Sequence, residues 1–249
     1  MTGIDLNADL GEGFGRYGLD GDLEVMPLIT SANVACGFHA GDPRTIDAAV
    51  AAAREHGVRV GAHPGFPDLV GFGRRPMRLT AQEITSDLTY QIAAVDGFCR
   101  RHGLRLHHVK PHGALGHQAW HEPEVAAAVI DAVTALDPGL VIVALSGCVL
   151  ERQARAAGLA VAREAYLDRA YRPDGGLVPR GEQGAVLHDR EEIVRRARRL
   201  VSEGTVTAID GTVLRADPDT LCLHGDTAGS VALLRAVRTA LREDGALAA

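Results

Sequence analysis

The sequence repeats one local pattern seven times: a short, mostly apolar strand is followed by a helix, or by a loop that leads to one. The strands are expected near residues 4, 31, 58, 106, 140, 160 and 220. Such alternation implies parallel strands joined by right-handed crossovers. A chain of 249 residues also has the usual length of one (β/α) barrel domain. We therefore predict an α/β fold in which residues 1–249 form a single seven-stranded TIM-like barrel. A doubly wound open sheet is the alternative.

Residues 31–43 show this pattern most clearly. Apolar residues end a buried strand and two glycines permit a tight turn. Asp42 and Pro43 then form the N-cap and first residue of a helix. His39 is thereby placed between a strand and a helix N-terminus, where α/β enzymes carry catalytic residues. A single histidine is equally consistent with a structural role, so the argument depends on repetition.

Other predicted strands also end in polar side chains. Period-two geometry puts the polar residues of the first strand, up to Asp9, on one face. In the fourth strand it aligns His108, Lys110 and His112, which are costly to bury unless they face carboxylates, a ligand or water. In a barrel the strand C-termini converge on one mouth. The residues expected to meet there are Asp9, Glu12, His39, His63, Lys110, His112, Glu164, Asp168, His224 and Asp226.

Two connecting segments carry further predictions. Residues 64–75 are rich in glycine and proline and contain Arg74 and Arg75. This loop is long for a strand-to-helix connection, so it is either a lid or anion-binding loop or an ordinary surface loop. Residues 205–214 are expected to form a β-hairpin that turns at Asp210 and Gly211, outside the main sheet.

Composition and motifs exclude several classes of function. The net charge of −6 argues against nucleic acid or an anionic membrane as the main partner. We find no run of about twenty apolar residues and no secretory leader. The four cysteines lack CxxC spacing, so we expect a cytoplasmic protein with reduced thiols. No G-x-x-x-x-G-K-[ST] motif occurs, so ATP, if used, is not held by a conventional phosphate loop.

The residues alone leave two kinds of chemistry open. Acids, imidazoles and an ammonium group gathered together suit proton transfer and stabilisation of a developing oxyanion. They also suit a hydrolytic metal site, for which Asp9, His39 and His63 are the candidate ligands. The sequence does not choose between them, because barrel sites lack a fixed local spacing of ligands.

Segments of the chain resemble, in order, the signature blocks of the LamB/YcsF family: Asp5–Glu12, Ser31–Pro43, Gly61–Gly65, Gly71–Arg75, Val109–Leu115, Asp168–Tyr171 and His224–Asp226. The match spans essentially the whole chain, with departures at Ala8 and Gly116–His117. The resemblance implies a seven-stranded barrel akin to the glycoside hydrolase and deacetylase group. It also implies the activity of the A subunit of bacterial 5-oxoprolinase. That activity is the ATP-dependent opening of 5-oxoproline (pyroglutamate) to L-glutamate, together with B and C subunits.

On this hypothesis we assign roles to the predicted site. The expected catalytic residues are Asp9, Glu12, His39, His63, Lys110, His112 and His224. The expected substrate-binding residues are Asn7, Arg74, Arg75, Glu164, Asp168 and Asp226. ATP with Mg²⁺ is the expected cofactor, another divalent metal is open, and so is a homo-oligomer. The alternatives are a metal-dependent deacetylase or hydrolase that needs no ATP, and a non-catalytic subunit that presents 5-oxoproline to its partners.

Overall fold

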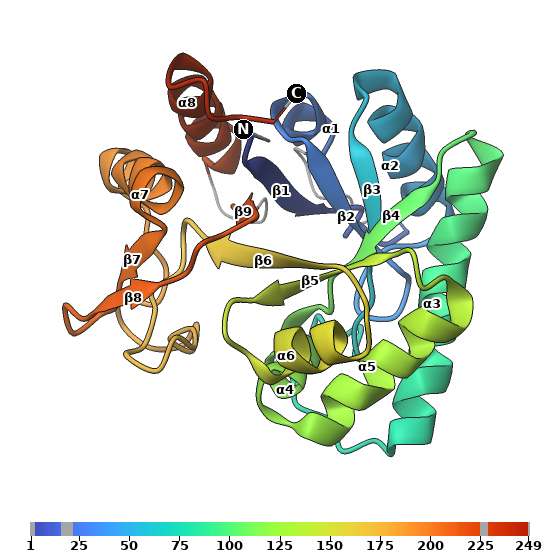
Figure 1. The fold of residues 1–249 in the computed structure, drawn as a ribbon. Coiled ribbons are helices and arrows are strands. Elements are labelled where there is room, and N and C mark those ends of the chain that lie inside the picture. The colour runs from blue at the N-terminus through green and yellow to red at the C-terminus, as the bar shows by residue number, and fades with distance from the viewer. Residues whose placement is uncertain (1–2, 16–21, 225–228, 249) are drawn as a thin grey trace.

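The computed structural model of the chain describes residues 3–15, 22–224 and 229–248. Within these residues, seven parallel strands close a barrel in which β9 is hydrogen-bonded to both β6 and β1 (Figure 1). The predicted α/β barrel is confirmed, and the alternative of an open sheet is wrong. In order around the barrel, the strands are β1 (Asp5–Leu10), β2 (Ser31–Ala35), β3 (Arg59–His63), β4 (Leu106–Val109), β5 (Val141–Leu145), β6 (Val161–Tyr166) and β9 (Thr220–Cys222).

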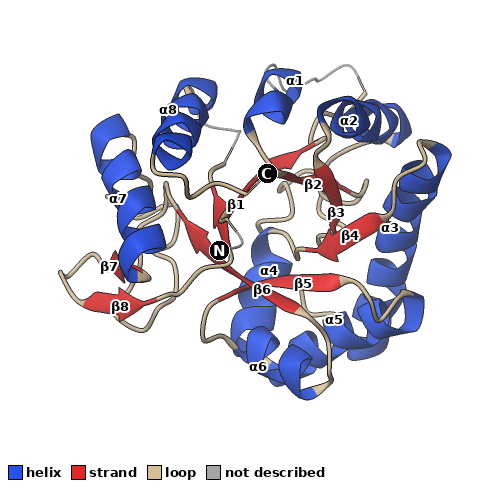
Figure 2. Ribbon diagram, turned by 45° about the horizontal axis from the view of Figure 1, so that its top comes forward, coloured by secondary structure: helices blue, strands red, loops and turns tan. Residues whose placement is uncertain are grey.

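Helices cover the outside of the barrel (Figures 1 and 2). In the described residues they are α1 (Asp22–Val25), the 3-10 helix η1 (Met26–Leu28), α2 (Pro43–His56), α3 (Ala81–Arg101), α4 (Gly113–His121), α5 (Pro123–Leu136), α6 (Val149–Ala156), α7 (Arg190–Glu203) and α8 (Ser230–Glu243). Several begin or end at the signals that the sequence provides. Asp42 caps α2, Thr80 and Glu83 form a capping box at α3, and Gly57 ends α2 in the left-handed conformation.

The strands separate an apolar core from a polar barrel interior. Alternate residues of β1 show the division. Leu6 and Leu10 are completely buried in the apolar core, whereas the Asn7 amide donates to the Thr220 hydroxyl inside the barrel. Burial of each leucine side chain stabilises the fold by roughly 1.5–3 kcal/mol relative to exposure. The fold is therefore held mainly by packing between sheet and helices, and the barrel interior is left for polar groups.

The structure confirms one local prediction, a hairpin, and contains one helix that the sequence did not predict. The predicted hairpin is confirmed: β7 (Thr205–Thr207) pairs antiparallel with β8 (Val213–Arg215) beside α7 (Figure 1). By contrast, α4 was not predicted. It begins at a glycine, and its N-cap residue His112 makes no capping hydrogen bond within the described chain. It therefore lacks the local signals that mark a helix start.

The described segments at the two ends of the chain lie side by side near β1 (Figure 1). The N–H of Ile4 donates to the Ala246 carbonyl at 2.7 Å, and the N–H of Ala248 donates to the Ile4 carbonyl at 2.9 Å. These bonds add a short parallel bridge next to the barrel. A separate observation concerns membranes: across the described ranges, we find no helix with the length and apolar character needed to span a bilayer.

Candidate active site

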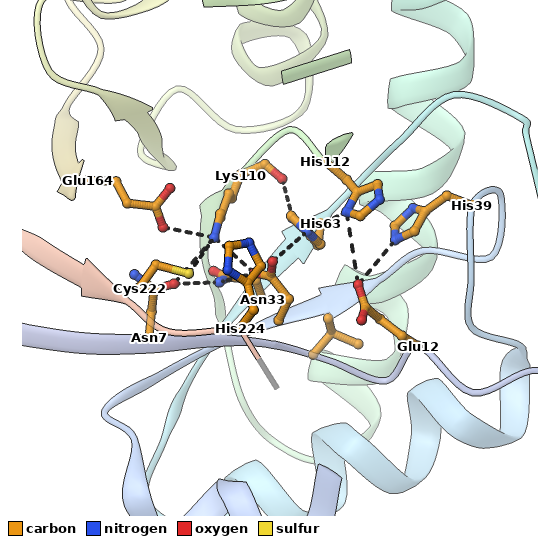
Figure 3. Close-up of polar contacts among 12 residues, drawn as sticks. Asn7, Glu12, Asn33, His39, His63, Lys110, His112, Glu164, Cys222 and His224 are labelled. Atoms are coloured by element: carbon orange, nitrogen blue, oxygen red, sulfur yellow. Dashed lines mark hydrogen bonds and ion pairs between the residues drawn. The ribbon is translucent and has the colours of Figure 1, made fainter. Parts of the chain in front are cut away.

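Polar residues at the C-terminal ends of the strands surround a cavity of about 390 Å³. This is the end of the barrel at which the sequence predicts the site, since parallel strands all deliver their exits there. The charged and imidazole groups that line the cavity are Asp9, Glu12, His63, Arg74, Lys110, His112, His117, Arg169, Arg180 and His224. Figure 3 shows how the inner members of this set point toward one another.

Lys110 lies directly after β4 and is only 3 % exposed. Its Nζ is 2.9 Å from Asp9 Oδ1, 2.8 Å from Glu164 Oε1 and 3.2 Å from Cys222 Sγ (Figure 3). Burial opposes the positive charge, but nearby negative charge, chiefly that of Asp9, raises the pKa of Lys110 well above its usual range. Burial likewise opposes the charge of Asp9, yet His63 and Lys110 hold the pKa of Asp9 well below its usual value. Lys110 is therefore a permanent cation held between carboxylates.

A layer of amide and imidazole groups supports the Asp9 carboxylate. The Asn33 amide donates to Asp9 Oδ1 and to Asn7 Oδ1, in both cases at 2.8 Å. Its own Oδ1 lies 2.7 Å from His108 Nε2. Burial lowers the pKa of His108 to about 3, so the ring is neutral and donates this bond through Nε2. Gly61 lies between Asn33 and His108 in the sheet register, and a Cβ there would collide with the imidazole.

Three imidazoles and a carboxylate form a second group, which we call the histidine cluster: Glu12, His39, His63 and His112 (Figure 3). His63 ends β3, and the other three follow β1, β2 and β4. The rings of His39 and His112 stack with centroids 3.7 Å apart, and His63 lies edge-on to both. Burial, followed by the neighbouring imidazoles, lowers the pKa values of His39 and His112 well below the usual range. Both rings are therefore neutral near pH 7.

The loop of residues 64–75 packs against the histidine cluster and supplies the space for its rings. A Cβ on Gly65 would lie 2.8 Å from His39 Nδ1. A Cβ on Gly73 would lie 2.7 Å from His39 Cβ and 2.8 Å from His112 Cδ2. Gly73 also has a φ of 63°, which side-chain-bearing residues rarely adopt. Gly65 and Gly73 are thus explained by close approach to the imidazoles, whereas Gly71 makes room for the Asp68–Arg75 pair.

His224 is oriented by Asp168. Its Nδ1 lies 2.9 Å from both carboxylate oxygens of Asp168, and its ring stacks on Tyr166 with centroids 5.4 Å apart. Burial opposes the Asp168 charge, but His224 lowers the pKa of this carboxyl. Because an ionised carboxylate only accepts hydrogen bonds, Nδ1 must donate, which leaves Nε2 of a neutral ring as a proton acceptor.

Three arginines add positive charge to the cavity wall: Arg74, Arg169 and Arg180. Arg169 is buried, with 7 % of the residue exposed. Its guanidinium donates to the backbone carbonyls of Val178 and Ala185. Arg75 behaves differently from its neighbour Arg74. It forms an ion pair with Asp68 and is absent from the cavity wall formed by the described residues.

Most of the predicted site residues come together. Those that line the cavity or contact its lining residues directly are Asp9, Glu12, His39, His63, Arg74, Lys110, His112, Glu164, Asp168 and His224. Asn7 lies one layer deeper, with its Oδ1 3.5 Å from Lys110 Nζ. Arg75 points to Asp68 instead of the cavity. Asp226, also predicted to bind the substrate, lies outside the described residues.

Five further residues contribute to the site without having been predicted to: Asn33, His108, Tyr166, Arg169 and Cys222. Four of them, Asn33, His108, Tyr166 and Cys222, share a strand face with a predicted residue or occupy an inward position of a strand. The period-two alternation of the strands could therefore have indicated these four. Arg169 had no such signal, because its position depends on how a long loop folds back over the barrel.

Two groups of side chains have the composition of a cation site. One is the histidine cluster, and the other is formed by Asp9, Cys222 and His224. In the second group the Lys110 ammonium already contacts the carboxylate and the sulfur, so a positive charge is in place there. The structure therefore joins the predicted ligands His39 and His63 with Glu12 and His112, whereas the Asp9 carboxylate contacts both Lys110, at 2.9 Å, and His63, at 3.4 Å.

Comparisons with known proteins agree with one another. The LamB/YcsF family model matches residues 4–249. A relative from Natranaerobius thermophilus, named as the A subunit of 5-oxoprolinase, is 52% identical over 245 residues, which are 98% of this chain and 95% of the relative. The crystal structure of a lactam utilization protein from Thermus thermophilus matches with a TM-score of 0.94 and 50% identity, covering 99% of this chain and 98% of that one.

A more distant likeness concerns the fold alone. A family 4 carbohydrate esterase from Streptomyces lividans matches with a TM-score of 0.50 and 12% identity, covering 99% of this chain and 91% of that one. This agrees with the barrel type expected from the sequence, the type shared with deacetylases. At this level of identity the likeness says nothing about the reaction.

Proposed function

This chain belongs to the LamB/YcsF family, and we propose that it acts as the A subunit of a 5-oxoprolinase, opening 5-oxoproline to L-glutamate. The observation that carries the proposal is identity of about half the residues, over nearly the whole of both chains, with relatives named for this activity. The site supports it, because the residues that match the family blocks converge on one cavity. A volume of about 390 Å³ lies at the lower end of the usual range for small-ligand sites and suits a five-membered lactam.

The charges of the cavity fit the two polar ends of 5-oxoproline. Its carboxylate would be bound by the arginines of the wall, Arg74, Arg169 and Arg180, since guanidinium groups bind carboxylates through paired hydrogen bonds. Its ring carbonyl would then point toward Lys110, whose ammonium is fixed by Asp9 and Glu164. A preorganised cation stabilises negative charge that develops on that oxygen during ring opening.

Proton transfer would fall to His224. Nδ1 is held by Asp168, so Nε2 is free to take a proton from the attacking water and to return it to the ring nitrogen as the C–N bond breaks. We further propose that the reaction consumes ATP with Mg²⁺ and requires B and C partner subunits. ATP would transfer its terminal phosphoryl group to the lactam oxygen and leave as ADP. Water would then add to the activated ring carbon, the C–N bond would break with its nitrogen protonated, and a second water would hydrolyse the resulting acyl phosphate to glutamate and phosphate. The subunit letter in the relatives' name supports the need for partners.

The test is release of glutamate from 5-oxoproline by this chain combined with its candidate B and C partners, with ATP and Mg²⁺ present or omitted. We expect glutamate only when all of them are present. The His224→Gln variant should reduce turnover strongly while leaving the complex intact on size-exclusion chromatography. Full activity of that variant would contradict catalysis by this chain and would favour a subunit that only presents the substrate.

A second candidate function is favoured by one observation, the histidine cluster beside the cavity. Such a cluster suits a metal-dependent hydrolase of amide or acetyl groups that needs no ATP. The same assay separates the two functions. Glutamate formation by the isolated chain with a divalent metal and without nucleotide would overturn the ATP-dependent proposal in favour of this one.

A further inference from the structure

The histidine cluster brings together groups that can each offer a lone pair to one point. One ligating atom from each of Glu12, His39, His63 and His112 lies within 4.8 Å of all the others. All four side chains are buried. Imidazole nitrogens and carboxylate oxygens that converge in this way repel one another unless something positive lies between them.

The tautomers of two rings are fixed by backbone carbonyls. His63 Nδ1 lies 2.7 Å from the Lys110 carbonyl, and His112 Nε2 lies 2.8 Å from the Phe72 carbonyl. A carbonyl only accepts, so each of these nitrogens carries a hydrogen. The remaining nitrogens, His63 Nε2 and His112 Nδ1, face each other at 2.9 Å, and His63 Nε2 also lies 3.4 Å from Asp9 Oδ2. Carbonyl groups behind histidines are also the usual way to orient metal ligands.

His39 gives independent support. Its side chain is completely buried, and neither of its ring nitrogens has a hydrogen-bond partner among the described residues. Its Nε2 lies 3.8 Å from Glu12 Oε1, which in turn lies 3.9 Å from His112 Nδ1. A fully buried imidazole without partners is costly, so its position indicates a ligand at this point.

We propose that Glu12, His39, His63 and His112 bind one divalent transition-metal ion of the zinc class. Three imidazoles and one carboxylate are ligands that Zn²⁺ and its neighbours prefer, whereas Mg²⁺ and Ca²⁺ prefer oxygen. Tetrahedral ligands at the usual zinc distances lie roughly 3.3–3.5 Å apart. Three of the separations, 2.9, 3.8 and 3.9 Å, are near that spacing, and the stacked rings of His39 and His112 would tilt apart to bring a nitrogen of each onto one ion. Binding of the ion stands on this geometry alone; any part that it takes in ring opening rests on the proposed function.

A shared proton is the competing explanation. A proton between His63 and His112 would satisfy that pair of nitrogens. It would still leave both ring nitrogens of His39 without a partner among the described residues. A metal ion also accounts for the buried His39, which is why the geometry favours it.

The test measures metal content and not turnover. The full chain is purified without a metal-affinity tag, stripped with a chelator and dialysed against Zn²⁺ or Co²⁺, followed by elemental analysis. We expect one ion per chain and a visible absorption spectrum for the Co²⁺ form. His39→Gln and His112→Gln should each weaken binding roughly 100-fold or more, because even residues behind ligands cost 10- to 100-fold. His102→Gln is the matched control, since His102 pairs with Asp47 away from the cavity.

Two results would overturn the proposal: less than one tenth of an ion per chain after dialysis, or one bound ion whose affinity is unchanged in both cluster variants. If the variants fold poorly, a melting experiment on the unaltered chain still tests metal binding. Zn²⁺ that binds the folded chain must raise its melting temperature in a concentration-dependent way. A chain that binds the ion but forms no glutamate with its partners would contradict the proposed function and leave this inference standing. A complex that forms glutamate although this chain binds no ion would contradict the metal-binding inference and leave the proposed function standing.

Discussion

Lys110 shows how much of the site depends on single side chains. It is a buried cation between two buried carboxylates, and its backbone carbonyl also orients His63. Attraction inside the barrel offsets the cost of removing these charges from water, but only while every partner is present. Neutralising one member therefore leaves the others uncompensated. This gives Lys110 two separable roles, in the proposed reaction and in stability.

We expect Lys110→Met to abolish glutamate formation and to lower the free energy of unfolding by about 3–5 kcal/mol, the usual cost of leaving buried charges unpaired. The double variant Lys110→Met with Glu164→Gln should regain part of that stability without regaining activity. Urea unfolding and the glutamate assay measure the two effects. A single variant as stable as the unaltered chain would show that the carboxylates do not need Lys110.

At this scale, the sequence predicted the residues that lie on an alternating strand. Asp9, His63 and Lys110 were found because strand geometry alone puts them at the mouth of a barrel. Arg75 was predicted beside Arg74 because adjacent residues are alike in sequence, whereas in the structure Asp68 captures Arg75. Which of two neighbouring arginines enters a cavity depends on a loop conformation, and no local pattern encodes that.

The helix α2 shows how one capping residue connects two loops. Asp42 Oδ1 accepts the N–H groups of Arg44 and Thr45, while Oδ2 accepts the N–H of Gly15 from the loop after β1. These bonds, first that of Gly15 and then those of the helix, lower the pKa of Asp42 to about 2, against an ordinary 3.8. The pKa of Asp42 is depressed in the folded state. The ionised carboxylate therefore contributes its full share to the free energy of unfolding above about pH 4, and this share is lost as the pH falls toward 2.

We expect Asp42→Ala to lower the free energy of unfolding by about 1 kcal/mol at pH 7, as for other N-cap replacements. The difference from the unaltered chain should shrink as the pH falls from about 4 to about 2. Urea unfolding at pH 7 and pH 3 measures it, with Asp131→Ala, an exposed position on α5, as control. A difference that stays constant over this range would contradict the role of the charge.

Elements with strong local signals carry their boundaries in the sequence. The helices α2, α3, α5 and α7 have side-chain caps, an initial proline or a terminal glycine. The exception, α4, is held by tertiary contacts instead, since the N–H of Ala114 in its first turn donates to the Gly73 carbonyl of another loop. Its start is set by a neighbour distant in sequence, which explains why no local pattern predicted it.

At the scale of the molecule, closure of the barrel ties both ends of the chain to one place. β9 pairs with β1, and Ile4 bonds to residues on either side of Leu247. The regular alternation along the sequence narrowed the fold to a barrel or a doubly wound open sheet, and the chain length favoured the barrel. The layering of side chains inside the barrel was not predictable in the same way, since it depends on register between strands far apart in sequence.

A circular permutant tests the closure. A short linker would join the present ends, and new ends would be made at the exposed turn Asp210–Gly211 of the hairpin. We expect native-like circular dichroism and a cooperative melting transition, because no barrel strand is interrupted. New ends between Gly61 and Ala62, inside β3, should prevent cooperative folding. Equal stability of the two permutants would contradict the closed barrel as the cooperative unit.

The division into an apolar shell outside the sheet and polar groups inside it has a consequence for laboratory evolution. In a library of random variants, exchanges among aliphatic residues in the outer shell should mostly alter expression yield, because such positions tolerate changes that preserve volume. Exchanges at inward positions such as Asn33 or His108 should instead abolish activity even in the clones that are still expressed, because they disturb the contacts of Asp9. Sorting such a library for expression and for activity would therefore divide the barrel residues by the face of the sheet on which they lie.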